Sequence, residues 1–279
     1  MRADVRDKRD AFLGRIGARP LIMGILNVTP DSFSDGGRFL VAEAALAHAR
    51  TMVTAGADIV DIGAESTRPG ATPVSEAGEL VRLAPALAAL QALEVPLSVD
   101  TSKAAVAVRA AELGAAVIND VWGLQRDPGM ADAVAEAEAA VVVMHNRTET
   151  DDSLDIIADI RRFFDRSLDI AARAGIPRER VILDPGIGFA KSSRQNRDVV
   201  ARLGELKDYR LPILIGASRK RFLGSLTGDG VEDTLIGTLT VSLAAIAAGA
   251  DIVRVHDVAE HAAALKVLEA LQGRSSPLP

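Results

Sequence analysis

The chain alternates along its whole length between short apolar runs bounded by turn residues and longer stretches rich in Ala, Leu and Glu. Eight such apolar runs occur, at 21–28, 58–64, 96–100, 115–120, 139–145, 181–186, 212–217 and 251–257. Continuous apolar runs of this length are typical of parallel strands that are buried on both faces. The alternation therefore predicts parallel strands connected by helices.

The stretches between the runs have the periodicity of helices. We predict helices at 42–55, 76–93, 103–113, 154–174, 234–248 and 259–271. Four of them are followed by a glycine before the next strand: Gly56, Gly114, Gly175 and Gly249. Glycine adopts the left-handed conformation that commonly ends a helix, so each glycine indicates where a helix stops.

About eight strand-helix units follow one another without a linker or a break in composition, which is the number that closes a (β/α)8 barrel. A doubly wound open sheet is the structural alternative. The length of 279 residues fits one barrel, because such domains often have roughly 200 to 250 residues. We predict a single-domain (β/α)8 TIM barrel at 20–273, a tail at 274–279, and a segment at 1–19 that is either a lead-in or a lid on the barrel floor.

The composition excludes several classes of protein. With 32 Lys and Arg against 38 Asp and Glu, the net charge is −6, which disfavours a basic nucleic-acid-binding surface. Aromatic residues make up 3% of the chain, too few for base-stacking platforms. Because there is no cysteine, any metal must be bound by oxygen or imidazole, which favours a hard cation such as Mg²⁺.

The N-terminal sequence MRADVRDKRD is charged. No apolar stretch reaches the ~18 residues that a membrane span requires. We therefore expect a cytoplasmic enzyme with no membrane partner.

Polar residues gather where the apolar runs end. A single polar residue at a strand end is usually a helix cap or part of a turn, but here most of the strands have one. In a (β/α)8 barrel the carboxyl ends of the strands form the active-site face. The polar residues are Asn27, Asp61, Asp100, Asn119, His145, Asp184, Ser218 to Lys220, Arg254 and His256.

Several segments together resemble those of dihydropteroate synthases. They are MGILNVTPDSFSDGGRF (23–39), DIGAESTRPGA (61–71), LDPGIGF (183–189) and GASRKRFLG (216–224), with SVDTSK (98–103), IND (118–120) and RVHDV (254–258). Enzymes of that family condense 6-hydroxymethyl-7,8-dihydropterin pyrophosphate with p-aminobenzoate to give 7,8-dihydropteroate and pyrophosphate. The resemblance implies the same two small-molecule substrates here.

A pterin presents two adjacent N–H donors that one carboxylate can accept, and the resemblance assigns this role to Asp184. It implies that Asp100 and Asn119 bind the remaining ring nitrogens and that Lys220 reaches the pterin oxygen. Three adjacent cations at 219–221 repel one another and need an anionic partner. Phe189, in the same segment as Asp184, is also expected to bind substrate.

The diphosphate requires cations near the oxygens that gain charge as it departs. Arg254 and His256 fit this role because they alternate with Val255 and so share one face of a strand. Asn27 is expected to position Mg²⁺ on the diphosphate, because this ion keeps several waters and takes few protein ligands.

Two loops, at 29–38 and 65–73, are longer than a barrel connection requires and are rich in Gly, Pro, Ser, Thr and Asp. By resemblance they close over the substrates, with Phe33, Thr67, Arg68 and Pro69 as the matching positions. The p-aminobenzoate carboxylate is expected near the start of the helix at 218–221. Arg221 departs from the serine common in the family at that position.

The implied mechanism is departure of pyrophosphate and then capture of the cationic methylene by the arylamine, with Asp100, Lys220 and Arg254 as the catalytic residues. The alternatives are a pterin-binding methyltransferase barrel and a non-catalytic pterin-binding paralogue. The Ala-rich helix at 234–248 is compatible with a homodimer, as in the family, and equally with packing inside the barrel.

Overall fold

The computed structural model describes residues 1–29, 38–66, 72–227 and 234–271. Eight parallel strands form one sheet in the order β6-β5-β4-β3-β2-β1-β8-β7. The strands are β1 (Leu21–Asn27), β2 (Ile59–Gly63), β3 (Leu97–Asp100), β4 (Ala115–Asp120), β5 (Ala140–Met144), β6 (Val181–Asp184), β7 (Leu214–Ile215) and β8 (Ile252–Val255). Each predicted apolar run contains one strand.

The two ends of this order meet between β6 and β7. A parallel bridge joins Leu183 to Ile213, and the Leu183 amide donates to the Pro212 carbonyl at 2.9 Å. The contact closes the sheet into a barrel, so the predicted fold is confirmed and the open-sheet alternative is wrong.

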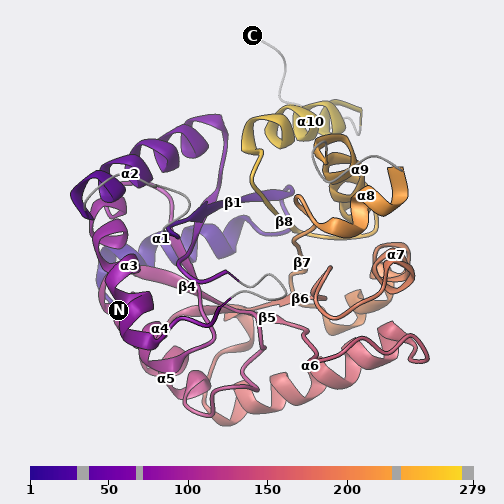
Figure 1. The fold of residues 1–279 in the computed structure, drawn as a ribbon, viewed down its shortest axis with the longest axis horizontal. Coiled ribbons are helices and arrows are strands. Elements are labelled where there is room, and N and C mark those ends of the chain that lie inside the picture. Colours follow the sequence, from indigo (N-terminus) through magenta and orange to yellow (C-terminus); the bar gives the residue numbers. More distant parts are fainter. Residues whose placement is uncertain (30–37, 67–71, 228–233, 272–279) are drawn as a thin grey trace.

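Helices surround the strands (Figure 1). They are α1 (Ala3–Arg15), α2 (Arg38–Ala55), α3 (Glu76–Leu90), α4 (Ala104–Glu112), α5 (Met130–Glu136), α6 (Ile156–Arg173), α7 (Ser193–Ala201), α8 (Arg221–Thr227), α9 (Leu235–Ala247) and α10 (Val258–Leu271), with short 3-10 helices at Arg178–Arg180 and Leu203–Tyr209. The six predicted helices are present, with ends shifted by a few residues. All four glycines predicted to end helices have positive φ, between 79° and 113°.

Alternate residues of each strand face the barrel interior, and their chemistry changes along the strand. The first inward residue is apolar and the next is polar: Ile59 and then Asp61 on β2, Val117 and then Asn119 on β4, Ile182 and then Asp184 on β6, Ile252 and then Arg254 on β8. The residues between them, such as Val60 and Val253, pack outward against the helices. The barrel therefore has an apolar floor and a polar mouth.

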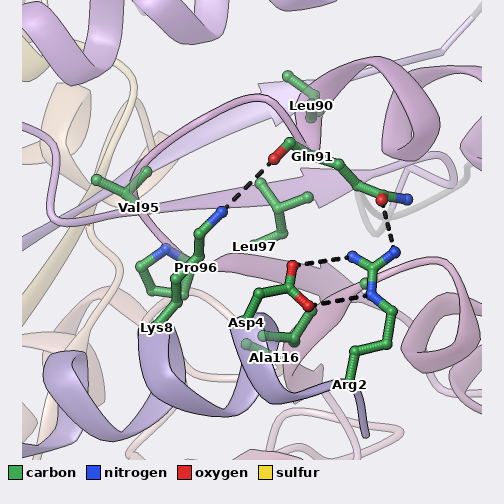
Figure 2. Close-up of a pocket in the computed structure, with 11 residues that line it drawn as sticks. Arg2, Asp4, Lys8, Leu90, Gln91, Val95, Pro96, Leu97 and Ala116 are labelled. Carbon is green, nitrogen blue, oxygen red and sulfur yellow. Dashed lines mark hydrogen bonds and ion pairs between the residues drawn. The ribbon is translucent and has the colours of Figure 1, made fainter.

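Helix α1 covers the floor. Its Phe12 is fully buried and, with Val5, packs against the inward apolar residues of the strands. Figure 2 shows a polar contact at the start of this helix, where Arg2 donates to the Gln91 side chain at 2.8 Å. The cavity drawn in Figure 2, which Arg2, Val5 and Gln91 help to line, has a volume of about 10 Å³. This is room for about one water molecule. No substrate-sized site exists at this cavity.

Over the described ranges, none of the helices has both the length and the apolar character that crossing a membrane demands.

We predict that Phe12→Ala lowers the free energy of unfolding by about 3 to 5 kcal/mol, because it leaves a cavity at a site that cannot collapse freely. Chemical denaturation measures the change. Asp7→Ala is the control, since Asp7 is exposed on the same helix and should change stability by about 0.5 kcal/mol or less. Equal effects of the two substitutions would show that α1 does not seal the core.

Candidate active site

Inward side chains from four strands form one hydrogen-bonded network at the mouth. Arg254 on β8 donates through Nε to Asp61 Oδ2 at 2.6 Å and through Nη2 to Asp100 Oδ2 at 3.0 Å. Asn119 on β4 donates through Nδ2 to Asp61 Oδ2 at 3.0 Å. The shared carboxylate of Asp61 thus fixes both the guanidinium and the amide in place.

Burial governs the protonation of this network. Burial raises the pKa of Asp100 to about 7, although the Arg254 guanidinium acts in the opposite direction. For Arg254 burial acts to lower the pKa, but the carboxylates of Asp61 and Asp100 outweigh it and the net shift is upward. Arg254 is therefore a permanent cation at the mouth.

Two acceptor atoms in the network, Asp61 Oδ1 and Asn119 Oδ1, are buried and lack a hydrogen-bond partner within the described part of the chain. Buried polar atoms are nearly always satisfied in folded proteins. Unpaired acceptors at the mouth of a barrel are the arrangement expected where a bound molecule supplies N–H groups.

Asp184 and Lys220 are two further ionisable groups at the mouth, close enough for each to shift the pKa of the other. Asp184 ends β6 and accepts from the Gly186 amide through Oδ1 at 2.7 Å. Burial raises its pKa, against the opposing effects of Lys220, the Gly186 amide, Lys191 and Arg254. Burial lowers the pKa of Lys220 to about 8, while the Asp184 carboxylate acts to raise it. Asp184, Lys220 and Arg254 thus share one electrostatic environment.

The loop after β6 forms the seat of Lys220. The ammonium donates to the Ile187 carbonyl and lies 4.5 Å from the centroid of the Phe189 ring. Gly188 lies against the lysine stem, because a Cβ there would come within 2.8 Å of Lys220 Cδ. A Cβ at Gly186 would lie 2.0 Å from the His145 carbonyl oxygen. Close approach to a backbone atom therefore requires glycine at 186, whereas the neighbour of Gly188 is a flexible side chain and its φ of 81° is what favours glycine there.

Arg254 and His256 lie on the same side of β8, because the fully buried Val255 between them faces the helices. His256 is held by Ser218, whose hydroxyl oxygen accepts from the His256 amide at 3.2 Å and lies 2.9 Å from His256 Nδ1. The two predicted basic residues thus share one side of the strand.

Comparison with known proteins identifies the family of this chain. Residues 23–256 match the family described as pterin binding enzyme. The dihydropteroate synthase of Bacillus subtilis (strain 168) is 45% identical over 254 residues, which cover 91% of this chain and 89% of that protein. The chain belongs to the dihydropteroate synthase family.

Solved structures of dihydropteroate synthases have the same architecture. The enzyme from Clostridium difficile, solved in the presence of pteroic acid, is 46% identical with a TM-score of 0.88 over 92% of this chain and 98% of that one. The enzyme from Xanthomonas albilineans, solved with 4-aminobenzoic acid, is 44% identical with a TM-score of 0.87 over 94% of each chain. Membership in the dihydropteroate synthase family makes the chain a transferase of folate biosynthesis and confirms the resemblance seen in the sequence.

Other residues expected from the dihydropteroate synthase resemblance lie at the rim. Asn27 ends β1 and is exposed, and its Oδ1 lies beside Gly63, next to Asp100. Arg221 is the first residue of α8 and is exposed. Phe33, Thr67, Arg68 and Pro69 lie outside the described residues.

His145 is an exception among the polar strand ends. Met144 pairs with Asp184 in the barrel register and shares its inward direction, so the next side chain points outward. The His145 ring lies against α6, with Nε2 3.3 Å from Asp159 Oδ2 and the ring centroid 5.0 Å from that of Phe163. Burial lowers its pKa to about 4. The expectation that it lines the mouth was wrong.

Two residues of the site, Asp61 and Lys191, have no role that the sequence predicted. Asp61 was recognised only as a polar strand end, although its position two residues after Ile59 signals an inward side chain. Lys191 is 7% exposed and contacts the loop that seats Lys220; nothing in its neighbouring sequence signals this burial.

We predict that Asp61→Asn lowers the free energy of unfolding by about 3 kcal/mol, because it removes a carboxylate that compensates a buried guanidinium. Denaturation at neutral pH measures the loss. Asp208→Asn is the matched control: Asp208 pairs with Arg161 at 2.7 Å with its side chain 75% exposed, and such pairs contribute about 0 to 1 kcal/mol. A loss no larger than that of the control would contradict a structural role for the Asp61 ion pair.

Proposed function

We propose that this chain condenses 6-hydroxymethyl-7,8-dihydropterin pyrophosphate with p-aminobenzoate, giving 7,8-dihydropteroate and pyrophosphate. The observation that carries the proposal is the convergence of Asp100, Asp184, Lys220 and Arg254 at one barrel mouth. Acidic groups suit the N–H donors of a flat heterocycle, and basic groups suit a departing diphosphate. The complexes described for the two relatives support the same substrate classes.

The pterin is bound by the inward residues of three strands. Asp184 accepts the exocyclic amine and the adjacent ring N–H, and each hydrogen bond to the carboxylate contributes about 1.5 to 3 kcal/mol. Asn119 and Asp100 bind the remaining ring nitrogens, and the unpaired Asn119 Oδ1 supports this placement. Lys220 donates to the pterin oxygen.

Arg254 and His256 hold the diphosphate. Because Asp61 and Asp100 already fix the guanidinium, its position need not change as the leaving group gains charge, which is the condition for electrostatic stabilisation of a transition state. The Ser218 contact holds the His256 ring on the same side of β8.

The rim fits a magnesium ion that is bound mainly by substrate. Among the described residues, no group of three or more His, Asp or Glu side chains could hold a metal, so a resident metal centre does not fit there. Mg²⁺ commonly uses one or two protein oxygens together with substrate phosphates and waters, and the exposed Asn27 side chain would supply one such oxygen. When bound, the ion would neutralise charge on the diphosphate.

The reaction begins with cleavage of the bond between the pterin methylene carbon and the oxygen that joins it to the diphosphate. The electron pair of this bond stays on the oxygen and leaves with pyrophosphate. Asp100 stabilises the resulting cationic methylene. The p-aminobenzoate nitrogen then forms a bond to the methylene carbon and releases one proton to solvent. Its lone pair is free at neutral pH, so the step requires no strong general base.

The second substrate is placed by residues around the mouth. By resemblance to the family, two loops close over the substrates and contribute Phe33, Thr67, Arg68 and Pro69, with Thr67 and Arg68 near the pyrophosphate and the ring of p-aminobenzoate. Phe189 also binds substrate, and Arg221 lies near the p-aminobenzoate carboxylate. Homodimerisation through α9 and α10 fits the same proposal, because these helices expose Ile236, Val267 and Leu271.

Product formation from dihydropterin pyrophosphate, p-aminobenzoate and Mg²⁺ tests the function. We expect dihydropteroate and pyrophosphate in equal amounts. Pyrophosphate release that does not depend on the amine and gives no dihydropteroate would indicate a hydrolase or a degenerate paralogue instead.

We predict that Lys220→Ala lowers the rate of dihydropteroate formation by more than about tenfold, because the loss of one or more charged hydrogen bonds in the transition state costs at least about 1.4 kcal/mol. Lys266→Ala, an exposed change on α10, is the control and should leave the rate unchanged. An unaltered rate in a folded Lys220→Ala protein would remove this lysine from the site.

We predict that kcat/KM falls as the pH rises above about 8, where Lys220 loses its proton. Of the groups that face this lysine, Asp100 has a pKa of about 7 and so is largely ionised above pH 8, Arg254 stays protonated, and burial raises the pKa of Asp184. In Lys220→Arg the guanidinium stays protonated, so the fall moves to higher pH even where the maximal rate is lower. A pH profile with the same alkaline limb in both proteins would assign that limb to another group.

A further inference from the structure

The loop that seats Lys220 has an irregular backbone. Three of its residues have positive φ: Gly186 at 70°, Gly188 at 81° and Ala190 at 42°. Neither β6, which ends at Asp184, nor α7, which begins at Ser193, extends into it. Because the Ile187 carbonyl accepts from Lys220, the position of that ammonium depends on what holds this loop.

Lys191 holds the loop from within the protein. Its Nζ donates to the Gly186 carbonyl at 2.7 Å, to the Phe189 carbonyl at 3.2 Å and to the His145 carbonyl at 3.4 Å. An ammonium has three N–H donors, and the three acceptors match them. Two of the carbonyls lie on either side of Ile187, and the third belongs to His145, the residue after β5, so one side chain joins both sides of the seat to the barrel wall.

Asn196 on α7 also holds this loop. Its Oδ1 accepts from the Gly188 amide at 2.7 Å, and its Nδ2 donates to the Lys191 carbonyl at 3.2 Å. The Asn196 side chain is buried. Together the two side chains satisfy backbone groups that no regular element satisfies.

The burial of Lys191 is costly, which argues that it serves more than packing. Over the described residues its Nζ forms no ion pair, whereas the half-buried Lys103 pairs with both Glu65 and Glu79. Burial lowers the pKa of Lys191 well below its usual range, whereas the Asp184 carboxylate and the three carbonyl acceptors around Nζ favour the protonated form, which has one hydrogen for each carbonyl. An apolar side chain would fill the space without the desolvation cost of an ammonium.

We propose that Lys191 is a positioning residue for pterin binding: by fixing the carbonyls on either side of Ile187, it sets the place of the Lys220 ammonium opposite Asp184. This inference rests on the proposed function. Lys191 itself acts through the loop backbone and does not touch the substrate.

Lys191→Met tests the proposal, because it keeps most of the volume and removes all three donors. We expect the dissociation constant for 6-hydroxymethylpterin, measured by calorimetry without the amine, to rise by about tenfold or more. The KM for dihydropterin pyrophosphate should rise in parallel. The fraction of folded protein, measured by thermal melting, should differ from that of the wild type by less than about twofold. Lys191→Gln, which retains two donors, should recover part of the affinity.

Lys266→Met is the matched control, since Lys266 is exposed on α10. Pterin affinity equal to that of the wild type in a folded Lys191→Met protein would overturn the proposal, as would equal affinities of the Met and Gln variants. If Lys191→Met does not fold, Lys191→Gln takes its place, because the shorter side chain cannot keep all three Nζ hydrogen bonds, and wild-type affinity there would overturn the proposal. A wild-type protein that makes no dihydropteroate would count against the proposed function; wild-type turnover with unaffected Lys191 variants would count against this inference alone.

Discussion

The mouth of the barrel depends on a buried guanidinium shared between two carboxylates. Arg254 contacts Asp61 and Asp100, and Asp61 also accepts from Asn119. The network links β8, β2, β3 and β4, four strands of the barrel wall. Replacing a buried ion pair by apolar residues is often neutral or stabilising, so stability alone does not account for it. What the network supplies is a fixed cation whose orientation is set before any substrate binds.

The sequence predicted the barrel because its signals are local and repeated. Eight apolar runs and four helix-ending glycines each depend on only a few residues, and the structure confirms both. Helix α5 was missed because it has seven residues, and α7 was missed because it begins with polar residues. The covering role of α1 was left open between two alternatives, because its sequence is strongly polar and its buried Phe12 makes contacts far away in the chain.

The site was only partly predictable for a related reason. The sequence shows that Asp184 and Arg254 lie near the ends of strands. It does not show that Asp61 pairs with Arg254, because the curvature of the barrel brings together two residues that are 193 positions apart. The direction of His145 depends on the register of β5 against β6, and one residue decides between the mouth and the helix layer. Lys191 is harder still, because a lysine in a polar segment is ordinarily exposed and only the backbone path of the loop brings it inside.

The change from apolar to polar inward residues also constrains the register of the barrel. A shift of one residue in β2 would turn Asp61 into the helix layer and bring Ile62 to the mouth, and the same shift in β8 would bury Arg254 among apolar side chains. Each displaced charge would lose its partner and incur a desolvation cost of several kcal/mol. A shift of one residue in a purely apolar strand such as β5 carries no such cost, because it replaces one valine by another among Val141, Val142 and Val143. The charged groups at the mouth therefore discriminate against shifted pairings that the apolar core alone would tolerate, and the residues proposed to bind substrate also help to specify the fold that presents them.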